Sequence, residues 1–285
     1  YGLTRSEHLT GHALRDRDGS HVLSTKVGRL MTTVRAGRDL PPEAPKNPLD
    51  PGWWNGLPFR EVFDYTYDGV MRSYDDSQQR LGMARIDLLY VHDIGRVTHA
   101  GLHDHHWRQL TRGGGFRALQ ELKAAGDIRG FGLGVNEWEV CMSALDLGDW
   151  DVFLLAGRYT MLEQTSLDPF LTTCLARNAS VIAAAPFNGG ALMGTGKWNY
   201  GAAPAHIIKR VADLEAFCKA RNVPIGAAAL QFALTHPAVV SVLTGPRSPA
   251  ELQSTLAWWN VQIPGTFWAE LKAAGLVDPR TPLPA

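Results

Sequence analysis

Short runs of apolar and β-branched residues recur along the chain, each with the length and character of a strand buried in a parallel sheet. The six runs are HVLSTKV (21–27), IDLLYVH (86–92), IRGFGLGV (128–135), VFLLAGRY (152–159), SVIAAAPF (180–187) and VVSVLTG (239–245). Amphipathic helical patterns lie between them, most clearly at 64–82, 114–126 and 205–222. This alternation predicts an α/β fold with a parallel sheet, either open and doubly wound or closed as a (β/α)8 barrel.

Two features favour the closed barrel. The strand and helix unit repeats without a break, and no GxGxxG turn follows any of the strands. A complete barrel has eight strands at about 30 residues per unit, so on the order of 50 residues, with two strands and one helix, are expected upstream. The prediction is one barrel domain over 1–285, incomplete at its N-terminal end. The Pro- and Gly-rich segment 32–59 is predicted to be a long loop over the barrel mouth.

Composition narrows the class of partner. The 28 Lys and Arg residues balance 28 Asp and Glu residues, so no net charge draws the chain to nucleic acid or to an anionic membrane. A small molecule is therefore the expected partner. The three widely spaced cysteines indicate buried thiols in a reducing compartment, which favours the cytoplasm. No apolar run approaches the roughly 20 residues of a membrane span, although the sequence leaves open a signal peptide upstream of Tyr1.

Polar residues at the ends of two predicted strands supply candidate chemistry. Reactive groups of parallel barrels lie at the carboxyl ends of the strands, where Lys26 and His92 are found. Tyr1 joins them if it directly follows the preceding strand. A Tyr, Lys and His set suits proton transfer at a carbonyl or carbinol, because an ammonium stabilises a phenolate and an imidazole orients the substrate oxygen. A surface lysine and a core histidine without a chemical role explain the same pattern equally well.

Two loops have the character of a phosphate site. FNGG (187–190) and GPRSPAEL (245–252) follow the last two predicted strands, where barrels often bind phosphate with a helix N-terminus. Gly245 allows close approach of the backbone, Ser248 suits a helix cap, and Arg247 lies beside it. Ordinary turn glycines and a routine cap explain each loop alone, so the coincidence of the two carries the prediction.

Several segments together resemble the aldo-keto reductase superfamily over nearly the whole chain. In order, they are YGLTRSEHLTG, VLSTKVGR, RIDLLYVHD, GFGLGVNEWEV, LLAGRYTMLEQ, APFNGGALMG and VLTGPRSPAELQSTL. The D-threo-aldose 1-dehydrogenase branch, also called L-fucose dehydrogenase, is the most similar, and the pyridoxal 4-dehydrogenases resemble it closely. The resemblance implies an extended nicotinamide dinucleotide and an Asp, Tyr, Lys, His tetrad. Tyr1, Lys26 and His92 fall on three of its members. The aspartate belongs upstream of Tyr1, which leaves the activity of this form open.

The resemblance also implies cofactor contacts. Asn136-Glu137 replaces the usual Ser-Asn pair that holds the carboxamide, and Ala184 replaces the ring that stacks on nicotinamide, with Phe187 as a candidate substitute. The arginine that grips an adenosine 2′-phosphate aligns with Glu251, so NAD is favoured and NADP is the alternative, through Arg247. The predicted cofactor-binding residues are Asn136, Glu137, Phe187, Asn188, Gly189, Gly190, Gly245, Arg247, Ser248, Glu251 and Thr255.

Three further sets of residues have two explanations each. The histidines of HAGLHDHH (99–106) are either a zinc or nickel site or polar loop residues, and the second is favoured, so no metal is expected. Trp53 and Trp54 either stack on a sugar substrate or line a hydrophobic lid. Arg29 and Arg158 either face the pocket or form surface ion pairs, and surface pairs are expected.

These observations predict a cytoplasmic NAD-dependent oxidoreductase that oxidises an aldose, L-fucose or a D-threo sugar, at C1 to the lactone. One alternative keeps the chemistry and makes the enzyme a pyridoxal 4-dehydrogenase or a generic aldehyde reductase. Two others change the class, to a non-catalytic barrel that binds the dinucleotide or to a metal-dependent hydrolase built on the histidines. The expected partner is a small sugar or aldehyde, with neither nucleic acid nor a membrane.

Overall fold

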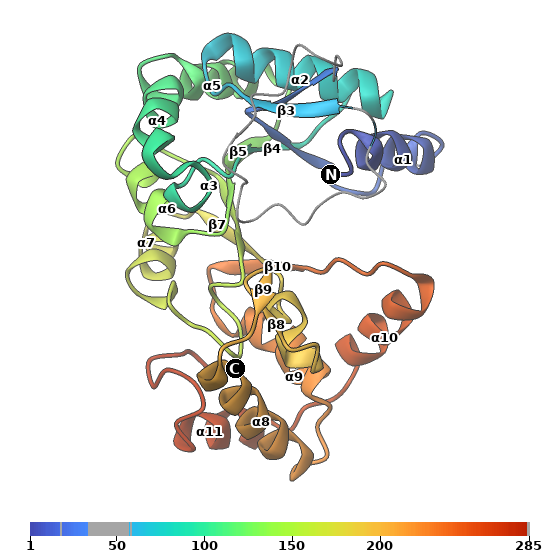
Figure 1. Ribbon diagram of the computed structural model, residues 1–285, viewed down its shortest axis with the longest axis vertical. Coiled ribbons are helices and arrows are strands. Elements are labelled where there is room, and N and C mark those ends of the chain that lie inside the picture. The colour runs from blue at the N-terminus through green and yellow to red at the C-terminus, as the bar shows by residue number, and fades with distance from the viewer. Residues whose placement is uncertain (18, 34–56, 58, 284–285) are drawn as a thin grey trace. The chain divides into compact units, whose positions relative to one another are not determined.

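The computed structural model describes residues 1–17, 19–33, 57 and 59–283 (Figure 1). The chain forms two compact units. Unit 1 comprises Tyr1–Val135 and Ala144–Asp151, and unit 2 comprises Asn136–Ser143 and Val152–Ala285. That residues 1–285 form one barrel domain stays a prediction.

Unit 1 is built on three parallel strands in the order β1 (Ser24–Val27), β4 (Leu88–His92) and β5 (Gly130–Val135). Lys26 lies opposite Tyr90 in the register of β1 and β4. Because side chains alternate between the two faces of a strand, His92, two residues after Tyr90, lies on the same face as Lys26. The sheet therefore places both candidate side chains on one face at the carboxyl ends of neighbouring strands.

Helices accompany these strands, and α2 and α5 lie side by side (Figure 1). Thr66 caps α2, its hydroxyl accepting from the Gly69 N–H, and Gly82 ends the helix in the left-handed conformation at φ 62°. The helices of unit 1 are α1 (Arg5–Leu14), α2 (Tyr67–Leu81), α3 (Arg96–His99), α4 (His103–Thr111) and α5 (Gly115–Ala125), with a short turn η1 (Ala100–Leu102) between α3 and α4. α6 (Trp138–Leu145) contributes residues to both units.

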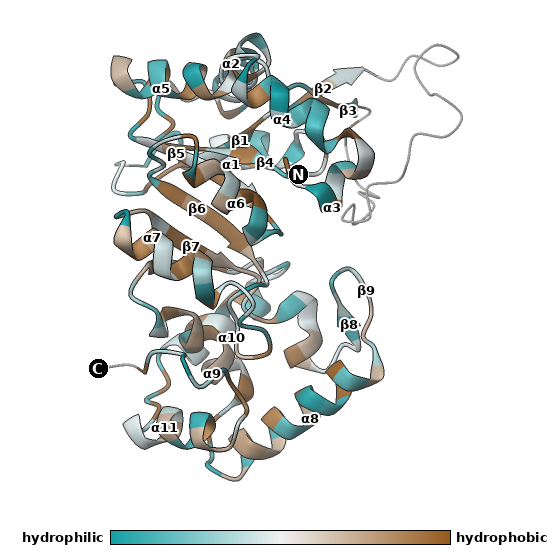
Figure 2. Ribbon diagram, turned by 90° about the vertical axis from the view of Figure 1, so that its left-hand side faces the viewer, coloured by the Kyte–Doolittle hydropathy of each residue, from teal (hydrophilic) through white to brown (hydrophobic). Residues whose placement is uncertain are grey.

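Unit 2 has three parallel strands in the order β6 (Val152–Ala156), β7 (Ser180–Ala184) and β10 (Val239–Leu243). β6 is apolar along its length (Figure 2), as a strand with two covered faces requires. A small hairpin joins β8 (Lys197–Trp198) to β9 (Gly201–Ala202). The helical segments are η2 (Leu167–Leu171), α7 (Thr172–Ala176), η3 (Asn188–Met193), α8 (Ala205–Lys219), α9 (Ile225–Phe232), η4 (Ala233–Thr235), α10 (Pro249–Trp259) and α11 (Gly265–Ala273).

All six strands predicted from the sequence are confirmed, each somewhat shorter than its apolar run. The prediction that each is buried is wrong for β10, most of which is exposed. β6 and β7 end where the next residues, Gly157 at φ 70° and Ala185 at φ 54°, leave the extended region. The loop prediction for 32–59 is wrong at its ends. Thr32 and Thr33 belong to β2 (Arg29–Thr33), which pairs antiparallel with β3 (Phe59–Phe63). Trp53 and Trp54, predicted to contact substrate, lie outside the described residues.

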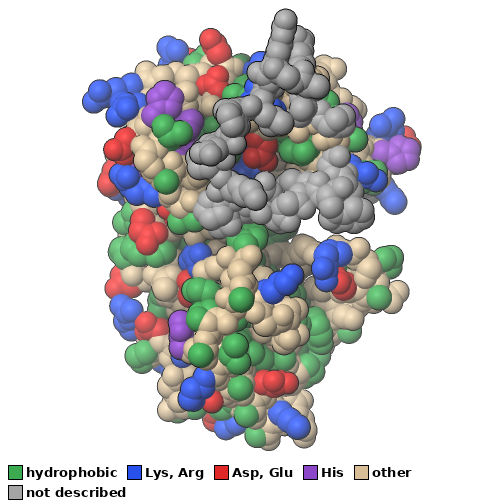
Figure 3. All heavy atoms as spheres, viewed as in Figure 1, with side chains coloured by type: hydrophobic (Ala, Val, Ile, Leu, Met, Phe, Trp, Pro, Cys, Tyr) green, Lys and Arg blue, Asp and Glu red, His purple; other side chains and the backbone are tan. Residues whose placement is uncertain are grey.

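The surface agrees with a neutral chain. On the face in Figure 3, basic and acidic side chains are interspersed rather than gathered by sign. The formal net charge is zero at pH 7. Among the described helices, none is both long and apolar enough to cross a membrane.

Candidate active site and cofactor pocket

The three predicted catalytic side chains come together in unit 1. Lys26 Nζ donates a hydrogen bond to Tyr1 Oη at 2.7 Å and lies 4.4 Å from the centre of the Tyr1 ring. The Tyr1 and His92 rings meet edge to face, with their centroids 5.7 Å apart. All three line one cavity of about 140 Å³. The arrangement offers a phenol, a cation bonded to it and an imidazole to one small substrate.

His92 is held as a neutral imidazole. Burial, reinforced by the charges of Arg29 and Lys26, keeps the pKa of His92 well below its usual range. A neutral imidazole carries one N–H donor and one acceptor, so His92 can orient an oxygen atom without adding charge. Its Nε2 lies 3.3 Å from Asp93 Oδ2.

Arg29 organises the acidic side of this cavity. Its guanidinium pairs with Glu61 at 3.0 Å and with Asp93 at 2.8 Å, and its side chain is only 11% exposed. The expectation of a surface ion pair is wrong for Arg29: it forms ion pairs, but they are largely buried and the residue lines the cavity. The reason is that β2 and β3 run antiparallel and place Arg29 and Glu61 on the wall of the cavity.

Unit 2 contains a pocket of about 710 Å³. Seven of the predicted cofactor-binding residues line it: Phe187, Gly189, Gly190, Gly245, Arg247, Glu251 and Thr255. The N-terminus of α10 is capped by Ser248, whose hydroxyl accepts from the Glu251 N–H at 3.2 Å. The same pocket is lined by glycines and by two cations, Lys197 and Arg247. Together with the helix N-terminus, they suit the phosphates of a dinucleotide.

Glu251 also fixes the loop before α10. Its carboxylate accepts hydrogen bonds from the backbone N–H of Arg247 at 2.7 Å and from the Arg247 guanidinium at 3.0 Å. These contacts, the backbone bond first, lower the pKa of Glu251. Glu251 is therefore an anion in the pocket wall. The Arg247 guanidinium forms an ion pair with it.

Sequence reasoning missed a further group of pocket residues. Trp258 is the largest of them and meets Phe187 edge to face at 5.8 Å between centroids. Gly226 of α9 makes room for it, because a Cβ there would lie 2.6 Å from the indole. The missed lining residues include Met193, Thr195, Lys197, Ser254 and Trp258. Ser254 and Trp258 follow Glu251 by three and seven residues, so the helical period of α10 is the signal that could have found them.

Four predicted cofactor residues do not line this pocket among the described residues: Asn136, Glu137, Asn188 and Ser248. Asn188 is buried, accepting from the Thr160 hydroxyl at 2.5 Å and donating to the Gly157 carbonyl at 3.2 Å. The Asn136 carbonyl accepts from Arg158. A cofactor role for these four residues stays a prediction.

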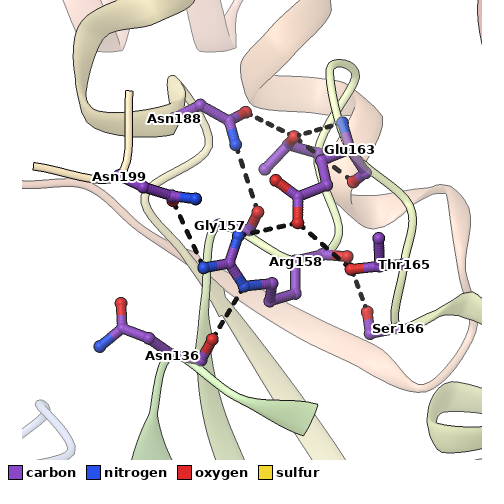
Figure 4. A network of polar contacts seen from close by, with 9 residues as sticks. Asn136, Gly157, Arg158, Glu163, Thr165, Ser166, Asn188 and Asn199 are labelled. Carbon is purple, nitrogen blue, oxygen red and sulfur yellow. Dashed lines mark hydrogen bonds and ion pairs between the residues drawn. The ribbon is translucent and has the colours of Figure 1, made fainter. Parts of the chain in front are cut away.

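Arg158 connects three loops of unit 2 (Figure 4). It donates to the Asn136 carbonyl at 2.8 Å, to Glu163 Oε1 at 2.7 Å and to Asn199 Oδ1 at 3.3 Å. Asn199 lies in the turn of the β8–β9 hairpin. The Arg158 side chain is 17% exposed, so the expected surface ion pair is instead a largely buried one. The buried position follows from the three loops that converge on its guanidinium.

The histidines of the 99–106 segment lie in α3 and α4, not in the expected loop. His99, His103 and His106 are buried. His103 Nδ1 donates to the Ile94 carbonyl at 3.0 Å, and His106 Nδ1 donates to Gln109 Oε1 at 2.9 Å, because both oxygens can only accept. No group of three or more His, Cys, Asp or Glu side chains is arranged to hold a metal within the described ranges.

A (β/α)8-type fold, a Tyr, Lys and His cluster and a phosphate-compatible pocket define an oxidoreductase that uses a nicotinamide dinucleotide. Residues 1–275 match the model of the Aldo/keto reductase family, and the chain belongs to that family.

The chain is similar to two relatives of named activity and to two solved structures. A pyridoxal 4-dehydrogenase from Microbacterium luteolum is 57% identical over 98% of this chain and 82% of its own length. A D-threo-aldose 1-dehydrogenase from a Pseudomonas species is 34% identical over 97% of this chain and 82% of its own. The holo form of an aldo-keto reductase from Bacillus halodurans has a TM-score of 0.70 at 19% identity, covering 98% of this chain and 80% of its own. A glycerol dehydrogenase from Gluconobacter oxydans has a TM-score of 0.67 at 17% identity, covering 100% of this chain and 80% of its own. At these identities the structures support the fold alone.

Proposed function

We propose that the protein is a NAD-dependent dehydrogenase that oxidises the cyclic hemiacetal of pyridoxal to a lactone. The observation that carries the dehydrogenase chemistry is the 2.7 Å hydrogen bond between Lys26 and Tyr1 beside the neutral His92. The choice of substrate is supported by the 57% identity to a pyridoxal 4-dehydrogenase. The sequence alone favours an aldose as substrate. The higher identity to the pyridoxal 4-dehydrogenase favours pyridoxal instead.

Each of the three side chains has one task in this reaction. Tyr1 Oη accepts the proton of the hemiacetal hydroxyl, and the Lys26 ammonium stabilises the negative charge on Oη. His92 orients the substrate oxygen. The dinucleotide, when bound, supplies the acceptor for the hydride that leaves the same carbon. The C–H and O–H bonds break and a C=O bond forms, so the products are lactone, NADH and a proton.

The pocket of unit 2 is proposed as the dinucleotide site. Phe187 and Trp258 would form its aromatic wall, and Lys197 with the N-terminus of α10 would face phosphate. NAD is favoured over NADP because a 2′-phosphate near α10 would meet the Glu251 carboxylate and compete with it for Arg247.

A second candidate substrate is an aldose such as L-fucose, supported by the 34% identity to a D-threo-aldose 1-dehydrogenase. Sugars and pyridoxal share a cyclic hemiacetal, so the same three residues serve both. We also propose the cytoplasm as the location, since Cys141, Cys174 and Cys218 are free and buried.

One assay tests the proposed chemistry, substrate and cofactor together. Formation of NADH or NADPH is followed with pyridoxal, L-fucose, D-arabinose and L-galactose, each with NAD and with NADP. We expect the highest kcat/KM for pyridoxal with NAD. Turnover of sugars alone would replace the substrate, a preference for NADP would overturn the Glu251 argument, and loss of every activity would overturn the dehydrogenase proposal.

A further inference from the structure

A tyrosine that the proposed reaction does not use lies against both strand ends of the catalytic cluster. The Tyr65 side chain is completely buried, and its hydroxyl donates to the His92 carbonyl at 2.7 Å. Its ring covers Gly28, two residues after Lys26, where a Cβ would lie 2.3 Å from a ring carbon. One side chain therefore contacts the backbone that carries both Lys26 and His92.

His99 orients the Tyr65 hydroxyl. Its Nε2 lies 2.8 Å from Tyr65 Oη. The His92 carbonyl can only accept, so the single hydroxyl proton of Tyr65 points to it and His99 supplies an Nε2–H to the tyrosine oxygen. Burial above all lowers the pKa of His99 to about 3, so the ring is neutral near pH 7 and carries the one proton that this bond requires.

A second histidine holds this pair in place. The His106 ring lies 4.2 Å from that of His99, centroid to centroid. Gln109 Oε1 accepts from His106 Nδ1 at 2.9 Å and from the backbone N–H of Tyr65 at 3.4 Å. His99 and His106 thus form a packed, hydrogen-bonded support around Tyr65.

We propose that Tyr65, oriented by His99, is a positioning residue of the active site: its hydroxyl fixes the backbone of His92 and its ring fixes the end of β1 beside Lys26. The kinetic part of this inference rests on the proposed function. Small displacements of reacting groups cost large factors in rate, so a group that fixes two strand ends affects turnover without touching substrate.

The first test compares two tyrosines that each lose only a buried hydroxyl. In Tyr65→Phe the bond to His92 is removed. In the control, Tyr159→Phe, a buried 2.8 Å bond to Thr235 in unit 2 is removed. We expect Tyr65→Phe to lower kcat by about 10-fold to 100-fold, with a smaller change in KM. The control keeps kcat even if both variants lose a similar amount of Tm. Equal kcat for the two variants would overturn the inference.

A second test separates orientation from packing. His99→Gln keeps an N–H donor for Tyr65, whereas His99→Leu fills similar space without one. We expect His99→Leu to reduce kcat in the same way as Tyr65→Phe, and His99→Gln to retain more activity than His99→Leu. The Tyr65→Phe/His99→Leu double variant should lose little more activity than either single variant. Additive losses, or equal losses in the two His99 variants, would show that His99 does not act through Tyr65.

NMR of protein labelled with ¹⁵N-histidine distinguishes failure of this inference from failure of the proposed function. An inactive wild-type protein would overturn the function, and the spectra would still decide the role of Tyr65. We expect Tyr65→Phe to move the ring signals of His92 and His99, and Tyr159→Phe to leave them in place. Unmoved His92 signals in Tyr65→Phe would overturn the positioning role.

Discussion

At the scale of single residues, the Lys26 ammonium is the group whose removal tests the proposed chemistry most directly. It donates a hydrogen bond to Tyr1 Oη at 2.7 Å, and the methionine of a Lys26→Met variant cannot donate one. Positioned acid–base groups contribute about 10²-fold to 10⁴-fold to the rate, so we expect Lys26→Met to lower kcat by a factor in that range. Steady-state kinetics with pyridoxal and NAD measures the change.

The matched control is Lys209→Met on α8. Lys209 pairs with Asp213 one helical turn away, and its side chain is 77% exposed. An exposed pair of this kind contributes little to stability, so kcat and KM should both stay unchanged. If Lys26→Met kept the kcat of Lys209→Met, proton transfer through Tyr1 and Lys26 would be wrong.

At the scale of elements, the contact between α9 and α10 shapes the proposed dinucleotide pocket. Gly226→Ala places a methyl group 2.6 Å from the Trp258 indole. We expect the indole to shift, which lowers the affinity for NADH several-fold, and overpacking to cost about 1–3 kcal/mol of unfolding free energy. Fluorescence titration with NADH and urea unfolding measure the two effects.

Gly265→Ala at the start of α11 is the control for that change. A Cβ at Gly265 has no heavy atom within 4 Å, so neither NADH affinity nor stability should fall. A Gly226→Ala variant that is destabilised but binds NADH normally would show that Trp258 does not contact the cofactor.

The elements also show what the sequence could predict. Parallel strands are marked by apolar and β-branched runs, so β1, β4, β5, β6, β7 and β10 could all be located from sequence. Burial could not be read from the runs, because β5 is buried throughout whereas β10 is largely exposed. The β2–β3 pair was missed because its strands flank a Pro- and Gly-rich segment whose composition indicates a loop. Trp258 and Tyr65 were missed for another reason. Their roles depend on contacts with Phe187 and His92, which only the fold brings near.

At the scale of the whole molecule, buried neutral histidines link stability to pH. Burial is the main cause of the lowered pKa of four of them: His92, His99, His106 and His236. Such a group binds a proton more readily in the unfolded chain, where its pKa is near 6.5. Unfolding therefore takes up protons below that pH. The stabilisation is complete above about pH 6.5 and is lost as the pH falls, for His99 down to about pH 3.

We therefore expect the free energy of unfolding to fall between pH 7.5 and pH 5.5, before most carboxylates titrate, a window set by the ordinary histidine and carboxylate pKa values. The slope of this free energy against pH reports the protons taken up on unfolding. His99→Gln should reduce that uptake by at most one proton per molecule, because glutamine does not titrate. Urea unfolding of the wild type and of His99→Gln at several pH values gives the two slopes. Equal slopes would mean that His99 becomes protonated without unfolding, which would contradict its role as a buried neutral donor to Tyr65.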